Sequence, residues 1–193
     1  MSAILAVICG ILVVVIDQVS KYLVTVKMDL NEVITIIPGV LNFNRILPNA
    51  GAAFGILEGK TWLLITVTAI IMVICIGLLI RKTFDSKLML WALCLVLGGG
   101  VGNMIDRVFR GGNVIDFLEF GFVEFPVFNI ADCAVCIGAA LMILYFISVF
   151  FKYSRKKAEL ANIDLDAMTA AAPEAESESE NTAVSENDGG EDK

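Results

Sequence analysis

Two aspartates lie within otherwise apolar stretches of this sequence. Asp106 ends a glycine-rich segment that begins at Gly98, and Asp132 lies in a second apolar stretch. Each has an asparagine three residues before it, Asn103 and Asn129, so that on a helix the amide and the carboxylate share one face. Ionisable groups inside membrane segments cost about 2.5–3.5 kcal/mol each on insertion scales, which makes both aspartates candidates for a functional role.

A pair of carboxylates suggests a specific chemistry. Two carboxylates held close together at low dielectric do not both ionise easily, so the pair shares one proton, as in the aspartic proteases. The ionised member can take a proton from water while the protonated member hydrogen-bonds the carbonyl oxygen under attack. The pattern therefore favours hydrolysis without a covalent enzyme intermediate, provided that Asp106 and Asp132 meet in the fold.

Each candidate also has a simpler structural interpretation. Asp106 could pair with Arg107 or Arg110, and Asp132 could cap the start of a helix, as Asn129 also could. Asp17 and Lys21 stand four residues apart, the spacing of an intrahelical ion pair.

Two further polar residues are ordinary for their surroundings. Asn49 is a common turn residue. Asp116 has the pattern of a solvent-facing residue on a strand, and the sequence assigns it no further role.

The residue inventory narrows the chemistry further. The chain has no histidine, which excludes Ser-His and Cys-His nucleophile pairs and histidine-ligated metals. Cys133 and Cys136 form a C-x-x-C, but positions i and i+3 of a membrane helix are neighbours on one face, so we interpret them as packing residues. We expect no metal, no other cofactor and no nucleic-acid partner.

The composition is that of an integral membrane protein. Hydrophobic residues make up 58% of the sequence, against roughly 45–50% in soluble domains. Apolar runs predict four spans, at about residues 3–26, 62–80, 88–105 and 129–151. We take the first run as an uncleaved span, because no basic region precedes it.

The basic residues predict an orientation for these spans. Arg81, Lys82 and Lys87 lie between the second and third spans, and Lys152 to Lys157 follow the fourth. The positive-inside rule therefore places both termini in the cytoplasm. At 1.5 Å per residue, Asp106 and Asp132 then lie roughly 27 and 28 Å from the cytoplasmic face, and Asp17 approaches the same layer.

Two segments lie outside the spans on the extracytoplasmic side. Residues 27–61 contain two short strand patterns around Pro38-Gly39, and residues 107–128 contain a possible strand, Val114 to Leu118, among several phenylalanines. Aromatic-rich amphipathic pieces suit the lipid headgroup region. We expect them to form a small sheet beside the aspartates.

The last part of the chain differs in charge. Residues 1–157 hold 13 Lys/Arg and 10 Asp/Glu, whereas residues 158–193 hold 1 and 11. The second part has no apolar period and is expected to be a mostly disordered cytoplasmic tail. The sequence thus predicts an all-α membrane protein, with a four-helix membrane domain at 1–157, a small extracytoplasmic β-rich part and an acidic tail at 158–193.

Five short blocks occur in order along residues 17–132. They are Asp17-Gln-x-x-Lys21, Asn49-x-Gly-Ala-Ala-Phe54, Gly98-Gly-x-x-Gly-Asn-x-x-Asp-Arg107, Val114-Ile-Asp-Phe117 and Phe128-Asn-x-Ala-Asp132. In this order, and on four predicted spans, the set resembles the motifs of the bacterial lipoprotein signal peptidases, signal peptidase II. The stretch Arg45 to Pro48 is unusual for that pattern, and the acidic tail lies outside it.

The resemblance implies an aspartic endopeptidase of the bacterial cytoplasmic membrane. Such an enzyme removes the signal peptide from diacylglyceryl-modified prolipoproteins by cutting on the N-terminal side of the lipidated cysteine. The resemblance also implies inhibition by globomycin and an extracytoplasmic β-cradle. Carried over by motif, Asp106 and Asp132 would be the catalytic pair. The residues that line or support the site would be Asp17, Lys21, Asn49, Asn103, Arg107 and Asn129.

Two other classes of protein also fit intramembrane acids. A proton-coupled transporter would place such groups near the bilayer midplane, often in repeated halves, whereas these lie toward one face. A membrane assembly factor would use the glycine-rich span to pack against partner helices. We expect a monomer in contact with membrane lipid.

Overall fold

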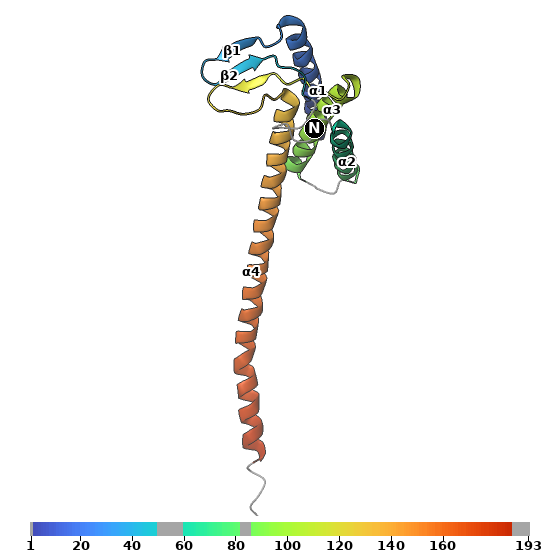
Figure 1. Ribbon diagram of the computed structural model, residues 1–193. Helices are drawn as coiled ribbons and strands as arrows, with labels where there is room; N and C mark the ends of the chain where they lie inside the picture. Colours follow the sequence, from blue (N-terminus) through green and yellow to red (C-terminus); the bar gives the residue numbers. More distant parts are fainter. Residues whose placement is uncertain (1, 50–59, 82–85, 187–193) are drawn as a thin grey trace, which may run out of the picture. The chain divides into compact units, whose positions relative to one another are not determined.

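The computed structural model describes residues 2–49, 60–81 and 86–186, and the chain divides into two compact units, Met1–Tyr145 and Phe146–Lys193. Four helices and three strands are described along it (Figure 1). In chain order they are α1 (Ser2–Lys27), β1 (Val33–Ile37), β2 (Leu41–Asn44), α2 (Thr61–Ile80), α3 (Lys87–Phe109), β3 (Leu118–Phe120) and α4 (Ile130–Glu186).

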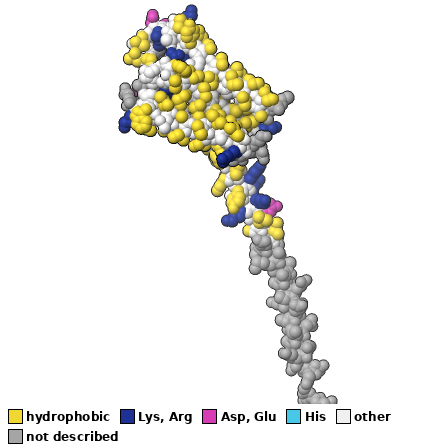
Figure 2. Space-filling view, turned by 90° about the vertical axis from the view of Figure 1, so that its right-hand side faces the viewer, with side chains coloured by type: hydrophobic (Ala, Val, Ile, Leu, Met, Phe, Trp, Pro, Cys, Tyr) yellow, Lys and Arg dark blue, Asp and Glu magenta, His cyan; other side chains and the backbone are white. Residues whose placement is uncertain are grey.

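Within the described residues, four helical stretches are long and apolar enough to cross a membrane. They are Ala3–Lys27, Thr61–Ile80, Lys87–Phe109 and Ile130–Ile163, which agree with the predicted spans. Outward-facing side chains on these helices are apolar, and Ile11 on α1 and Ile70 on α2 are both more than half exposed. Figure 2 shows one face of the helical body as a nearly continuous apolar surface, with Lys and Arg side chains gathered at its edges. The prediction of a four-helix membrane protein is confirmed.

Glycines let α3 approach its neighbours closely. A Cβ at Gly98 would lie 2.6 Å from the carbonyl oxygen of Gly10 on α1, and a Cβ at Gly99 would lie 2.3 Å from that of Ala131 on α4. Both distances are too short for a real side chain. The two contacts bring α1 and α4 against α3 at the level of the polar residues described below.

The three strands form one antiparallel sheet in the order β1-β2-β3. Its apolar side packs on α1, where Phe43 and Phe117 meet edge to face beside Val24 and Met28. The third strand differs from the prediction, because β3 begins at Leu118 rather than at Val114. The N–H of Ile115 donates to the Asp106 carboxylate, and Val114 pairs only with Asn49, so this backbone is held by a side chain and an isolated bridge.

The segment after residue 157 is described as helix as far as Glu186, the last residue of α4. The sequence predicted a mostly disordered tail for this segment. Alanine and glutamate, which are abundant there, favour helix in any solvated segment. The division of function at residue 157 stays a prediction.

Candidate active site

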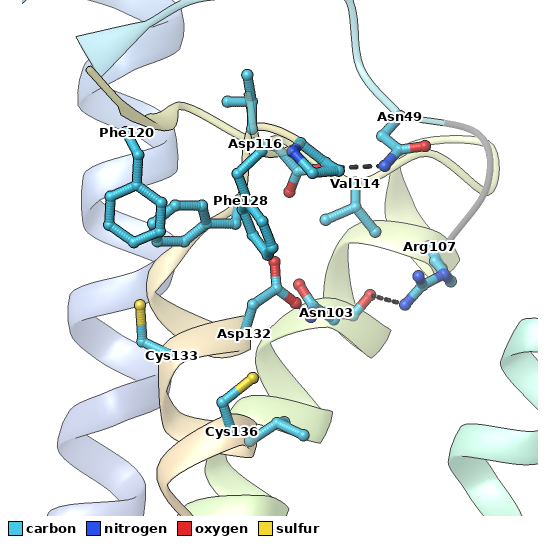
Figure 3. Close-up of a pocket in the computed structure, with 14 residues that line it drawn as sticks. Asn49, Asn103, Arg107, Val114, Asp116, Phe120, Phe128, Asp132, Cys133 and Cys136 are labelled. Carbon is cyan, nitrogen blue, oxygen red and sulfur yellow. Dashed lines mark hydrogen bonds between the residues drawn. The ribbon is translucent and has the colours of Figure 1, made fainter. Parts of the chain in front are cut away.

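The site is a cavity of about 460 Å³ beside the start of α4. Polar side chains occupy one end of its wall and apolar side chains the rest (Figure 3). The described residues that line it are Asn49, Asn103, Arg107, Val114, Asp116, Phe120, Phe125, Pro126, Val127, Phe128, Asp132, Cys133, Val135 and Cys136.

Two aspartates, Asp116 and Asp132, belong to this wall. Asp116 lies on the loop between α3 and β3, and Asp132 lies in the first turn of α4. Figure 3 shows both carboxylates directed toward the same space between the loop and the helix. The cavity therefore holds a pair of acids, but the pair is not the one that the sequence predicted.

Asp132 is fixed by the geometry of a helix N-terminus. Its backbone N–H donates to Asn129 Oδ1 at 2.9 Å, and the Asn129 N–H donates to Asp132 Oδ2 at 3.1 Å. This reciprocal pair is a capping box. Its second oxygen, Oδ1, accepts a hydrogen bond from Asn103 Nδ2 at 2.7 Å. The capping interpretation of Asp132 and Asn129 is thus correct, and the same carboxylate also faces the cavity.

Asp116 is held by two asparagine amides. Asn49 Nδ2 donates to its Oδ2 at 3.1 Å, and Asn129 Nδ2 donates to its Oδ1 at 2.6 Å. Asn49 is itself placed by backbone hydrogen bonds in both directions with Val114, at 2.8 and 2.9 Å. Asn49 is thus more than a turn residue, because its side chain supports an acid.

The environment of Asp116 changes its acidity. Only 5% of the residue is exposed. Its pKa is raised from 3.8 to about 6, chiefly by burial and next by the charge of Asp132. Hydrogen bonds from Asn49 and Asn129 and the charge of Lys21 lower the pKa by less. The prediction that Asp116 faces solvent is therefore wrong.

Asp106 lies elsewhere, in a fully buried charge cluster between α1 and α3. Its Oδ2 accepts from the Ile115 N–H at 3.1 Å and pairs with Lys21 Nζ at 3.0 Å. Its Oδ1 accepts from Gln18 Nε2 and from Arg110 Nε, each at 3.2 Å. Asp106 is not one of the described residues that line the cavity.

The pitch of the helix explains this placement of Asp106. Asn103 and Arg107 line the cavity, and successive helical residues are rotated by about 100°. Asp106 is rotated by about 100° from Arg107 and by about 60° from Asn103, so it lies at the edge of the cavity-lining face. There it meets Lys21 and Gln18 of α1. The pairing of Asp106 with Arg110, which was the simpler interpretation, is present.

Asp17 and Lys21 lie in the same buried cluster. Both residues are 0% exposed, and their charged groups are 2.8 Å apart. Asp17 Oδ1 also accepts from the Ala131 N–H at 3.0 Å, in the first turn of α4. The predicted intrahelical ion pair is thus present, and it also ties α1 to α4.

Arg107 brings a positive charge to the cavity. Its Nη1 donates to the Asn103 carbonyl at 3.5 Å, while its buried Nε has no hydrogen-bond partner among the described residues. A buried donor without a partner is costly, so a ligand with an acceptor group would be stabilised at this position. Residues 50–54 of the second sequence block lie outside the described residues.

Asp116 is the residue that sequence reasoning missed. It occupies the centre of the block Val114-Ile-Asp-Phe117, with apolar residues on both sides. An acid in an apolar run was the argument applied to Asp106 and Asp132, and the same signal was present here. What the sequence did not show was that the Gly111-Gly112 turn, with φ of 62° and 94°, folds this block back over α4.

Comparisons with known proteins agree with this architecture. The family model for signal peptidase (SPase) II matches residues 9–148. The lipoprotein signal peptidase of Shouchella clausii is 44% identical over 140 residues, which cover 72% of this chain and 91% of that protein. The lipoprotein signal peptidase of Brevibacillus brevis is 41% identical over 132 residues, which cover 68% and 87% of the two chains.

Solved structures show the same fold. One structure described as a bacterial membrane enzyme, at 2.3 Å resolution, aligns with a TM-score of 0.69 and 35% identity. The alignment covers 76% of this chain and 87% of that chain. A second, at 1.9 Å resolution, aligns with a TM-score of 0.65 and 36% identity over 75% and 91% of the two chains. The chain therefore belongs to the signal peptidase II family, membrane-embedded aspartic peptidases that cleave signal peptides from lipoprotein precursors.

Proposed function

We propose that Asp116 and Asp132 are the catalytic pair, in place of the expected pair Asp106 and Asp132. The observation that carries this proposal is that both carboxylates line one cavity and point into it, whereas both Asp106 oxygens are engaged in a buried cluster. A group that must reach a substrate bond needs access to it.

The surroundings of the two acids divide their roles. Asp132 accepts the Asn129 N–H at the N-terminus of α4, and we assign it the role of base. We assign the shared proton to Asp116, whose pKa is raised to about 6. The pair titrates as a unit.

The reaction follows from these roles. Asp132 takes a proton from water as the water oxygen attacks the peptide carbonyl carbon, while Asp116 gives its proton to the carbonyl oxygen. The neutral gem-diol then collapses: Asp132 returns a proton to the amide nitrogen, the C–N bond breaks, and Asp116 takes a proton from a diol hydroxyl. Both acids end in their starting states.

The cavity wall fits a lipid-bearing peptide. Away from the acids the wall is formed by apolar side chains such as Phe120, Phe128 and Val135. We assign to this part the diacylglyceryl group and the apolar residues beside the scissile bond. Arg107 Nε would donate to a peptide carbonyl. Cleavage on the N-terminal side of the lipidated cysteine is what the family resemblance implies.

The setting of the enzyme is also part of this proposal. We assign the protein to the bacterial cytoplasmic membrane as a monomer, with both termini in the cytoplasm and the cavity near the outer face. The basic residues Arg81 and Lys87, and those from Lys152 to Lys157, support this orientation.

Purified protein in lipid nanodiscs tests the function. A synthetic prolipoprotein segment is supplied with and without its diacylglyceryl group, and product masses are measured. The expected result is a single cut before the lipidated cysteine, with the unlipidated segment cleaved at least roughly 100-fold more slowly, because it lacks the group that binds the apolar wall. Equal rates for the two segments would contradict the substrate assignment.

A further inference from the structure

All hydrogen-bond donors of the Lys21 ammonium group are engaged by other side chains. An ammonium group has three N–H donors. Lys21 Nζ lies 2.8 Å from Asp17 Oδ2, 3.0 Å from Asp106 Oδ2 and 3.0 Å from Asn103 Oδ1. Lys21 is 0% exposed and is not among the described residues that line the cavity. Apart from the effect of its charge on the pKa of Asp116, any effect of Lys21 on catalysis passes through one of these partners.

Asn103 is the partner that reaches the catalytic pair. Its Oδ1 accepts from Lys21, and its Nδ2 donates to Asp132 Oδ1 at 2.7 Å. An amide rotated by half a turn would place its NH₂ against the Lys21 ammonium and its oxygen against the Asp132 carboxylate. Both contacts would then be repulsive, so the Lys21 charge, together with Asp132 and Asn129, favours the orientation in which Asn103 donates to Asp132.

The same orientation extends to the second acid. Asn129 Nδ2 donates to Asn103 Oδ1 at 3.1 Å and to Asp116 Oδ1 at 2.6 Å. Its own Oδ1 accepts from the Asp132 N–H at 2.9 Å. A chain of donors therefore runs from Lys21 through Asn103 to Asp132. Asn129 joins it by donating both to Asn103 and to Asp116.

We propose that Lys21 is a positioning residue for the catalytic pair, acting by orienting the Asn103 amide. This inference rests on the proposed roles of Asp116 and Asp132. Its consequence is that most of the contribution of Lys21 to turnover requires Asn103.

A double-mutant cycle tests this dependence. The cycle is built on Asp17→Asn, because the cluster in the Asp17→Asn/Lys21→Met protein then has the same net charge as in wild type, and an asparagine Oδ1 can still accept from Ala131. In that background we compare Lys21→Met, Asn103→Ala and both together, measuring kcat, KM and thermal unfolding on the lipidated segment. Met retains the length of the lysine side chain without its donors.

We expect the effects of Lys21→Met and Asn103→Ala on kcat not to be additive. Lys21→Met lowers kcat by roughly 10- to 100-fold with KM changed by less than about threefold, the size expected for one charge-assisted hydrogen bond. Once Asn103 is alanine, Lys21→Met lowers kcat by less than about twofold further.

Two results would overturn the inference. One is a loss of kcat that is equally large with and without Asn103. The other is a Lys21→Met protein that no longer folds while Asp17→Asn does, since Lys21 would then serve stability alone. Asp116→Asn in the same background checks the proposed pair separately: if that variant still cleaves, the catalytic assignment fails whatever the cycle shows.

Discussion

At the scale of single residues, residue type and spacing predicted some of the side chains that line the site but not the direction of all of them. Asp132 was predicted to be catalytic, and the motif resemblance implied that Asn49, Asn103 and Arg107 line or support the site. All four line the cavity. Asp106 was misplaced because the direction of a side chain depends on which neighbouring helix it meets. That neighbour is α1, whose Lys21 binds it.

The acidity of Asp116 predicts a pH dependence of stability. Its pKa is about 6 in the folded protein and near 3.9 in an unfolded chain. The folded state therefore binds more protons between these values, so stability falls as the pH rises from about 4 to about 6. The difference corresponds to roughly 3 kcal/mol that is present at low pH and lost above the folded pKa.

We expect Asp116→Asn to remove this part of the pH dependence. The unfolding temperatures of wild type and variant are measured in the same detergent from pH 4 to 7.5. The difference between the two proteins is then compared at each pH. The variant should gain stability relative to wild type as the pH rises through 6. A difference that is constant with pH would show that Asp116 is not the buried, proton-holding group described above.

At the scale of elements, the sheet and the helix contacts were unequally predictable. β1 and β2 follow the strand pattern around Pro38-Gly39, and Gly39 has the positive φ that the turn requires, at 71°. β3 was shifted, because the Ile115 N–H is taken by Asp106 and no local pattern reports that. The close contacts of α3 were predictable from its glycines, but their partners were not.

These contacts predict opposite effects for two similar substitutions. Gly98→Ala places a Cβ 2.6 Å from the Gly10 carbonyl oxygen, so α1 and α3 must separate. We expect a loss of roughly 1–3 kcal/mol in unfolding free energy. Gly77→Ala on α2 is the control, since nothing lies within 4 Å of its Cβ position. Alanine there should be neutral or stabilising, by up to about 1 kcal/mol. Equal losses in both variants, by denaturant titration in micelles, would contradict the proposed packing.

At the scale of the whole molecule, hydropathy was the most informative signal. Long uncharged runs define membrane helices without reference to tertiary contacts, so the four spans were predicted closely. The disordered acidic tail stays a prediction, because a segment without a packed face has little to decide between helix and disorder. α4 is described as helix as far as Glu186.

We propose that residues 158–193 take no part in cleavage. The cavity-lining residues all lie between Asn49 and Cys136 in the described part of the chain. A protein ending at Lys157 should therefore keep kcat and KM on the lipidated segment within about twofold of wild type, since no transition-state contact is removed. A large loss of kcat with unchanged unfolding would show that the tail serves the reaction.

The most direct test compares three isosteric substitutions, Asp116→Asn, Asp132→Asn and Asp106→Asn, in purified protein cleaving the lipidated segment. Asp116→Asn and Asp132→Asn should remain folded and lose at least about 100-fold in kcat, as expected when an acid or base is removed. Asp106→Asn should retain measurable cleavage with a lower unfolding temperature, because it belongs to the buried cluster. An active Asp116→Asn protein beside a folded but inactive Asp106→Asn protein would contradict the account.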